Sequence, residues 1–588
     1  MTAIKRAFAA TVVVALFVTV TAVLLLVWGL RLLQAGEQAL DQQRLPAAAH
    51  DFARARRRLS VASALLDPFA ITLDWLPPGR NNFGSAQRLA DGSVDLAQAG
   101  GDAAAAAGRA RSEGLTSEAV LAALGRTADL LASAETDVRA ASPGRFTAPP
   151  LAHAKRRIAA AAQRLADRVR VVAALGALLE ARGKYLLAVQ NPAELRATGG
   201  LVGAWGIIDT RRERVRLTQL GTDLDLPAPR QPVAVPGQFA ARYGRFGAAR
   251  LWANANMSAD FLTSARVLLG LYRSARGTSL DGVVAIDPVA LSYLLEIVGP
   301  VRVRGVELRA GRFVSQSLVE AYRLPREQRG QLLLAGAEAG WRAFREGRRL
   351  LEITQALGTA AAEGHLLAYA KAPWLERQLV HAGLAGAIAR PPGDYLLVVR
   401  QNAAANKLDY YLSTGLVYEV RVRADGNATA RLTIDLTNHA PRAGLPDYVT
   451  GGPLTGKPIG FARSWFSVYA PERGDVVRFS GTQGRTVESA VEAGHAVYSW
   501  FEGVAPGRTV RARLWFRLPR SVDDRHRYTL LVQRQPMLSP ARLVVRVNGR
   551  RLFAGPLFHA VTVAAPSEPA AGGGDHFASR HDQAGSGR

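Results

Sequence analysis

The 588-residue sequence contains no cysteine, only six lysines and ten histidines. The absence of cysteine excludes disulfides, thiol catalysis and cysteine-ligated metals, and it leaves the redox compartment undetermined. Histidines are scattered as well as scarce, which disfavours a histidine-based triad or zinc centre. No Walker loop, HExxH or GxSxG motif occurs either. The sequence therefore lacks the signatures of several common enzyme classes.

The N-terminus carries the longest hydrophobic run. Lys5 and Arg6 precede an uncharged stretch at residues 7–30, which as a helix would be about 36 Å long, enough to cross a bilayer core. We therefore expect a cytoplasmic tail at residues 1–6, an uncleaved transmembrane signal anchor at 7–30, and a single-pass protein of the cell membrane whose bulk is extracytoplasmic. A cleaved signal peptide is the alternative, although the run is long for one and no Ala-x-Ala site follows it cleanly.

Positive charge comes almost entirely from arginine. The chain carries 74 Lys and Arg against 48 Asp and Glu, a formal net charge of +26, which indicates anionic partners. The planar arginine fork suits phosphate and carboxylate, although a GC-rich genome gives the same bias. Outside a membrane, the expected partners are the lipid bilayer and lipid-linked phosphates or anionic wall polymers, and not nucleic acid.

The remaining chain divides by its hydrophobic periodicity, so the fold class is multi-domain. Residues 31–183 show apolar spacing of three and four residues and predict an α-helical bundle. Residues 184–345 alternate strand-like and helical runs and predict an α/β domain with a mixed sheet. Residues 346–411 predict a helical connector and a returning strand. Residues 412–565 alternate with period two and predict an all-β, sandwich-like region, followed by a disordered tail at 566–588.

A polar turn separates the first two predicted strands of the α/β region. Residues 184–205 read KYLLAVQNPAELRATGGLVGAW. Polar groups between buried strands are costly unless they face a ligand, water or each other. The turn is either a hairpin loop with satisfied polar groups or an anion-binding rim with Arg196 as fork donor. The candidate ligand-binding residues of this rim are Gln190, Asn191, Glu194, Arg196 and Thr198.

Other polar segments extend this candidate site. An arginine group at a helix break is either a surface salt-bridge network with Glu320 and Glu327 or a second anion-binding element. Its members are Arg323, Arg326 and Arg329. Asp287, directly before Pro288, is typical of an ordinary helix N-cap, and Ser258 is a plausible N-cap for the helix that follows it.

A faint internal echo appears later in the chain. Residues 393–402, GDYLLVVRQN, repeat the shape of residues 183–191, GKYLLAVQN. One echo does not establish a duplicated domain. The similarity predicts another strand that ends in a polar turn, and one position for this strand is in the same sheet. The polar and aromatic residues 405–411 are predicted to continue the rim.

The segment QNPAELRATGG resembles the opening signature of a bacterial envelope family, domain of unknown function 4012, over roughly residues 30–560. Residues 281–288, DGVVAIDP, continuing to IVGP at 297–300, are similar to that family's central strand-and-helix unit. Together with the arginine-rich helix after it, residues 184–345 resemble the core of the LytR–CpsA–Psr phosphotransferases. Those enzymes move glycopolymers from a polyprenyl-pyrophosphate carrier onto the cell wall.

The second resemblance implies roles for particular residues. Arg196 and the group Arg323, Arg326 and Arg329 would grip a pyrophosphate, and aspartates would hold a magnesium ion, for which this chain offers Asp223 with Asp225 beside it. The chain departs from that pattern in its first two strands, where Gln190 and Asn191 stand in place of aspartate. Magnesium prefers anionic oxygen ligands, so the departure leaves anion binding intact and weakens the case for catalysis.

These inferences combine into one expected function. We expect a membrane-anchored envelope protein that binds a lipid-linked or polymeric phosphate ligand, with glycopolymer phosphotransfer in cell-wall biogenesis as its enzymatic form. The alternative is a non-catalytic envelope scaffold or wall-polymer-binding protein. A weaker alternative is an extracytoplasmic sensor that signals through a partner.

Overall fold

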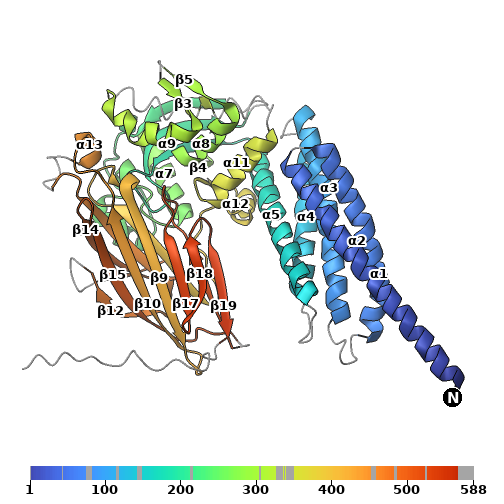
Figure 1. Cartoon of the computed structure of the whole chain (residues 1–588). Helices are drawn as coiled ribbons and strands as arrows, with labels where there is room; N and C mark the ends of the chain where they lie inside the picture. The colour runs from blue at the N-terminus through green and yellow to red at the C-terminus, as the bar shows by residue number, and fades with distance from the viewer. Residues whose placement is uncertain are drawn as a thin grey trace, which may run out of the picture.

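The computed structural model describes most of the chain. The described residues are 2–42, 44–73, 82–113, 118–141, 149–211, 216–303, 306–325, 335–336, 338–339, 350–451, 458–481, 487–523 and 526–566. They form a helical bundle, an α/β unit around a mixed sheet, and a large two-sheet β unit (Figure 1).

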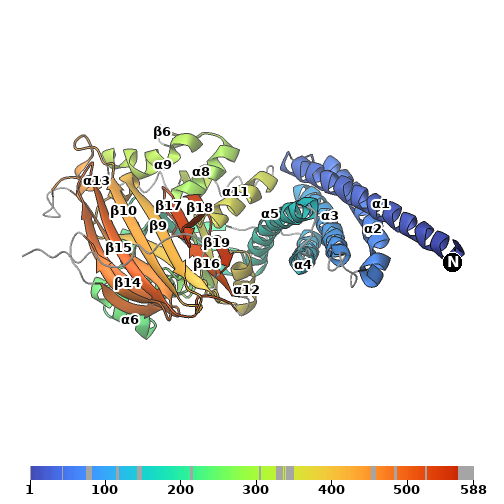
Figure 2. The same cartoon turned by 60° about the horizontal axis from the view of Figure 1, so that its bottom comes forward.

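The bundle lies at one end of the molecule. Its helices are α1 (Thr2–Asp41), α2 (Leu45–Leu73), α3 (Asn82–Glu113), α4 (Glu118–Ala140) and α5 (Pro149–Glu180). Their apolar stripes meet in one core, where Phe52, Leu59, Leu131 and Ile158 are buried. Helix α5 also contacts α11 (Leu350–Ala362) and α12 (Pro373–His381), and both views place it beside the α/β unit (Figures 1 and 2).

The structure contradicts the predicted transmembrane anchor. Across the described part of the chain, none of the helices combines the length and apolar character that crossing a membrane requires. Residues 7–30 belong to α1, which continues without a break to Asp41. From Ala22 onward its buried apolar residues contribute to the bundle core, and Gly29 packs directly on Leu59 of α2. The single-pass location inferred from this run is therefore contradicted, because no described helix meets the requirement for a membrane span.

The α/β unit is built on a five-stranded sheet in the order β3-β2-β1-β4-β7. Strand β1 pairs in parallel with β4 and antiparallel with β2, and the outer strands are also antiparallel to their neighbours. The strands of this sheet are β1 (Lys184–Asn191), β2 (Leu201–Asp209), β3 (Arg216–Thr222), β4 (Gly282–Ile286) and β7 (Leu366–Ala370). The last strand lies in the segment predicted as a helical connector.

Both faces of β1 are covered, which explains its continuous apolar sequence. Leu187 and Val189 point into a core shared with α5 and α8, while Leu186 and Ala188 point into a core shared with α7. The surrounding elements are α6 (Gly237–Tyr243), α7 (Phe261–Arg276), α8 (Pro288–Val298), α9 (Ala310–Leu318), the hairpin β5 (Val301–Val303) and β6 (Val306–Leu308), and the 3₁₀ turns η1 (Asp223–Asp225), η2 (Gly244–Phe246), η3 (Trp252–Asn254) and η4 (Glu320–Arg323).

Of the two predicted helix N-caps, one is confirmed and the other is wrong. Asp287 caps α8 as expected, accepting hydrogen bonds from the amides of Val289 and Ala290. Helix α7 is capped by Asp260 and not by Ser258, whose hydroxyl donates instead to Glu492 of the β unit.

Two six-stranded sheets pack face to face in the β unit. One has the order β13-β14-β11-β8-β16-β19 and the other β12-β15-β10-β9-β17-β18. The elements are β8 (Asp394–Asn402), η5 (Leu408–Tyr411), β9 (Leu412–Val422), β10 (Ala428–Asn438), α13 (Asp447–Thr450), β11 (Ala462–Pro471), β12 (Asp475–Ser480), β13 (Glu488–Glu492), β14 (His495–Val504), β15 (Thr509–Leu518), β16 (Arg527–Gln533), β17 (Arg542–Val547), β18 (Arg550–Pro556) and β19 (Val561–Pro566). Alternating burial along β9 and β10 follows the period-two pattern of the sequence.

A buried ion pair joins the α/β unit to the β unit. Arg242 of α6 lies 3.2 Å from Glu492 of β13 and donates to the hydroxyls of Ser467 and Ser499. The hydroxyls of Tyr243 and Tyr469 each donate to the same Glu492 oxygen at 2.6 Å. Because every partner is buried, the two units share a polar core and not only a surface contact.

A buried carboxylate joins the two sheets of the β unit. Asp394, at the start of β8, accepts hydrogen bonds from Tyr418 of the facing sheet at 2.9 Å and from Tyr528 of its own sheet at 2.5 Å. Burial raises the pKa of Asp394 from 3.8 to about 6, although these hydrogen bonds oppose the shift.

Asp394→Asn should remove a pH-dependent component of stability. Between the unfolded pKa and the raised folded pKa, the folded state binds more protons, so the contribution of Asp394 is full below pH 4 and is lost as pH rises through about 6. By pH 7 the contribution of Asp394 to the free energy of unfolding should have fallen by about 3 kcal/mol. Urea unfolding of both proteins from pH 4 to pH 8 measures it. A wild-type-minus-variant difference that stays constant with pH contradicts the assignment.

Candidate functional site

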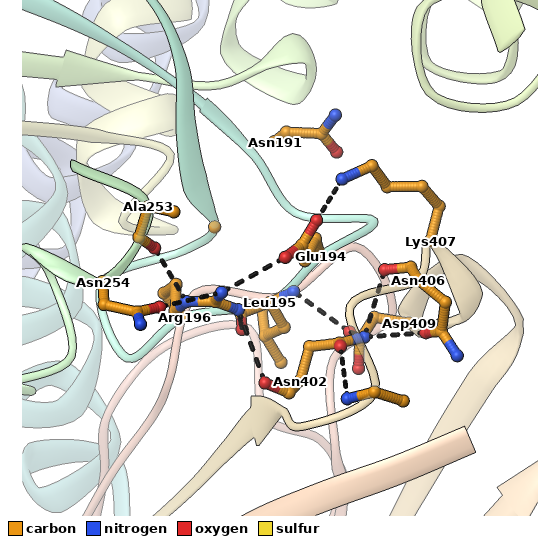
Figure 3. Close-up of polar contacts among 12 residues, drawn as sticks. Asn191, Glu194, Leu195, Arg196, Ala253, Asn254, Asn402, Asn406, Lys407 and Asp409 are labelled. Atoms are coloured by element: carbon orange, nitrogen blue, oxygen red, sulfur yellow. Dashed lines mark hydrogen bonds and ion pairs between the residues drawn. The ribbon is translucent and has the colours of Figure 1, made fainter. Parts of the chain in front are cut away.

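The ends of the two echoing strands meet, although the strands lie in different sheets. Strand β1 belongs to the α/β sheet and β8 to the β unit, so the echo does not mark neighbours in one sheet. Just beyond β1, the carbonyl of Leu195 accepts a hydrogen bond from the amide of Asn402 at 2.9 Å. The polar turn after β1 and the segment after β8 thus form one cluster (Figure 3).

Arg196 lies at the centre of this cluster and is buried. Its Nε donates to the carbonyl of Ala253 at 3.0 Å, and its Nη1 to the carbonyls of Leu195 at 3.0 Å and Asn402 at 3.5 Å. Its Nη2 donates to Glu194 at 3.2 Å and to Asn254 at 3.1 Å (Figure 3). A guanidinium has five N–H donors, so protein acceptors occupy the whole fork. In this arrangement Arg196 fastens the turn to its neighbours.

Glu194 connects Arg196 to a buried lysine. Its second carboxylate oxygen accepts a hydrogen bond from Nζ of Lys407, and both residues are buried. Burial raises the pKa of Glu194, but Lys407 and Arg196 outweigh this effect and hold the pKa below its ordinary value. Burial lowers the pKa of Lys407, but Glu194 and two tyrosines outweigh it, so the net pKa is raised. Both shifts favour the charged pair.

A second buried pair lies beside the first. Arg400 of β8 contacts Asp409, whose other carboxylate oxygen accepts from the amide of Leu195 at 3.0 Å and from the side chain of Asn402 at 2.7 Å. Asp409 thus ties the segment after β8 back to the turn after β1. Arg400 Nε is buried and has no hydrogen-bond partner among the described residues.

The cluster carries more positive than negative charge. Its cations are Arg196, Lys407 and Arg400, and its carboxylates are Glu194 and Asp409, all buried. One positive charge is therefore left over in a place where burying charge without a counter-charge is expensive. We call these five residues the ion network.

Two tyrosine rings lie over the lysine of the ion network. The Nζ of Lys407 is 5.9 Å from the ring centre of Tyr322 and 5.4 Å from that of Tyr448, and the two rings stack at 5.2 Å. Asn191 donates to the hydroxyl of Tyr322 at 2.7 Å, which ties η4 to the end of β1. Tyr448 is 55% exposed, so this aromatic pair connects the buried ammonium to the surface.

The other predicted rim residues lie around the same turn. Gln190 donates to the hydroxyl of Thr198 at 3.1 Å, and Asn256 donates to that same hydroxyl at 2.9 Å. Gly199, between strands at a φ of 127°, leaves room for the Gln190 amide where a Cβ would collide with it. Gln190 and Thr198 therefore support the turn from behind.

The predicted arginine group is only partly described. Arg323 is exposed on η4 next to Tyr322 and donates to the carbonyl of Gly444 at 3.2 Å. Glu320 pairs with Arg312 and not with Arg323. Arg326 and Arg329, with Glu327, lie outside the described residues.

The predicted metal residues lie after β3 and not in the ion network. Asp223 and Asp225 belong to η1, where the Asp225 carboxylate accepts from the amide of Thr222 at 2.6 Å and caps the turn. Within the ranges that the structure describes, no three His, Asp or Glu side chains gather in a way that could hold a metal ion. The magnesium site remains a prediction.

Sequence reasoning missed three members of the ion network. Lys407 and Asp409 fall in the polar segment 405–411, which was expected to extend the rim, but neither was singled out. Arg400 directly precedes Gln401 and Asn402, where Val189 precedes Gln190 and Asn191 in the first segment, so it stands in an otherwise apolar strand. A charged residue inside a buried strand, followed by a lysine in a chain with six, was the available signal.

The fold and its buried cluster define a mixed α/β unit joined to a β unit through a polar core. Residues 180–322 match the model of a family described as "Protein of unknown function (DUF4012)", which confirms that resemblance over the region that contains β1, the polar turn and α8. The comparisons do not show the resemblance to the LytR–CpsA–Psr phosphotransferases.

Other comparisons add little. No curated protein is similar in sequence to this chain. A solved structure, described as a nutrient binding protein from Legionella pneumophila, is 7% identical with a TM-score of 0.17, covering 26% of this chain and 54% of that one. The chain thus spans about half the length of that protein, and a TM-score this low shows no common fold.

Arg196→Met should destabilise the protein strongly. The variant keeps the apolar stem but removes one donor from each of three carbonyl groups and one cation from Glu194, so the free energy of unfolding should fall by about 3–5 kcal/mol. Urea unfolding measures the change. Arg323→Met is the control, since this exposed arginine should cost less than about 1 kcal/mol. Equal losses in both variants contradict the structural role of Arg196.

Proposed function

We propose that this protein binds a phosphate-bearing ligand at Lys407, below the stacked rings of Tyr322 and Tyr448, without itself transferring the phosphate. The observation that carries the proposal is the charge balance of the ion network, three cations against two carboxylates. An anionic ligand supplies the missing negative charge, and it gains strength from the low dielectric of the site.

Lys407 is the member of the network that a ligand can share. Among the described residues its ammonium has one hydrogen-bond acceptor, Glu194, although an ammonium has three donors. Arg196, by contrast, has every donor in use. We therefore assign the ligand-contacting role to Lys407 and the supporting role to Arg196.

The aromatic pair suggests what accompanies the phosphate. Stacked tyrosine rings present flat apolar faces with polar edges, a surface that suits sugar rings. The exposed Arg323 on η4 adds a positive charge beside the entrance. A phosphorylated sugar, alone or as the end of a glycan polymer or lipid-linked carrier, combines these features.

A more specific version of this proposal is phosphotransfer in the manner of the LytR–CpsA–Psr enzymes. It would add a magnesium ion and a transfer step to the same binding event. The residues of the ion network supply cations and hydrogen-bond donors, which favour binding a phosphate over activating a nucleophile. A non-catalytic wall-polymer-binding protein therefore fits the site better.

Titration with glucose 1-phosphate at fixed salt tests the proposal. Wild-type protein should bind, and Lys407→Met should weaken binding at least tenfold because the ligand loses its buried cation. Isothermal titration calorimetry with and without magnesium measures both, and a requirement for magnesium would favour the transfer form.

Two further variants separate a lost contact from lost structure. Lys407→Arg keeps the charge and should restore part of the affinity. Lys371→Met removes an exposed lysine whose Nζ donates to the hydroxyl of Ser279, and should bind like the wild type. Unchanged binding by Lys407→Met, or an equal loss in Lys371→Met, overturns the assignment.

A further inference from the structure

A second basic site lies at the end of the β unit, away from the ion network. The starts of β8 and β14, the turn between β11 and β12, and the end of β15 enclose a cavity of about 320 Å³. Its lining includes three arginines, Arg390, Arg473 and Arg520. We propose that this cavity binds a second anionic ligand, a phosphate or pyrophosphate group, independently of Lys407.

The arginines of the cavity are available for a ligand. In the part of the chain that the structure describes, the guanidinium groups of Arg473 and Arg520 have neither an ion-pair nor a hydrogen-bond partner, and both side chains are exposed. Arg390 uses only its Nε, which donates to the carbonyl of Ala493 at 2.7 Å. Many other arginines of the β unit are paired, as Arg431 with Glu419 and Arg511 with Asp435 illustrate.

The wall of the cavity is arranged to hold Arg390 in place. A Cβ added to Gly494, which has a φ of 76°, would lie 2.9 Å from the central carbon of the Arg390 guanidinium. The preceding Ala493 has a φ of 50°, an uncommon conformation for a residue other than glycine. Arg520 shares this conformation, also at 50°. The backbone therefore accepts unfavourable geometry at two places that position arginines on the cavity.

The carboxylates at the cavity cancel only part of this charge. Asp394 directs its oxygens to Tyr418, Tyr528 and the amide of Tyr395, so its carboxylate is occupied within the β unit. Glu472 is exposed on the rim. Three arginines against Asp394 and Glu472 leave an excess of one positive charge, and the exposed guanidinium forks suit the oxygens of a phosphate or pyrophosphate.

Inorganic pyrophosphate is the probe for this site. The double variant Arg473→Ser with Arg520→Ser should weaken its binding at least tenfold, measured by isothermal titration calorimetry on the full chain at fixed salt. The matched control is Arg550→Ser with Arg551→Ser, which removes the same two charges from β18, at the opposite edge of the sheet that begins with β12. The control should change the affinity less than twofold.

Repeating the titration in Lys407→Met separates the two sites. Pyrophosphate binding that persists in that variant and disappears when Arg473 and Arg520 are also replaced supports the cavity. Equal loss in both double variants would mean that only the overall charge matters. Any one of three results overturns the inference without affecting the role of Lys407. They are this equal loss, no loss in either double variant, and complete loss in Lys407→Met alone.

Discussion

The pairing of Glu194 with two cations is the interaction on which the arrangement of this molecule depends. It links the turn after β1 to the segment after β8, and so connects a strand of the α/β sheet with a strand of the β unit. Removing charges from water costs free energy that a hydrophobic contact would not cost. A chain that buries five charged side chains at one junction uses them for geometry, because hydrogen bonds to a fork and an ammonium fix direction as well as distance.

Arg242 and Glu492 form another buried ion pair between the α/β unit and the β unit. That pair joins α6 to β13, while Asp394 joins the two sheets of the β unit to each other. The three polar junctions differ in charge balance. The Arg242–Glu492 pair is neutral and surrounded by hydroxyl donors, whereas the ion network keeps a surplus positive charge and reaches the surface through Tyr448. This difference is the reason why we propose a ligand at the ion network and not at the other two junctions.

Much of the strand content could be predicted from the sequence, because short apolar runs bounded by polar turns have few other structures. The runs at 185–189, 201–208 and 282–286 are all strands. Strand β7 was missed because LLAYA follows an alanine-rich helix and shares its composition. The N-terminal run was misassigned because Ala, Leu and Val suit a bundle core as well as lipid, and the sequence does not say which surface such a run contacts.

The candidate site was harder to predict than the strands. The turn after β1 and its polar residues could be recognised locally, but the partners that determine their roles could not. From the sequence, Arg196 is a candidate to bind an anion through its guanidinium group. Only the positions of Ala253, Asn254 and Asn402 show that its donors are occupied. The role proposed for Lys407 depends on its position beside Tyr322 and Tyr448, which no spacing rule relates to it.

The separation of Glu194 and Lys407 along the chain also determines when their contact can form during synthesis. Glu194 and Lys407 are 213 residues apart. At about 5–20 residues per second, a ribosome needs roughly ten to forty seconds to pass from one to the other. During that interval Glu194 has Arg196 two residues away but does not yet have Lys407. The contact between the end of β1 and the segment after β8 can therefore form only after both units have largely been synthesised.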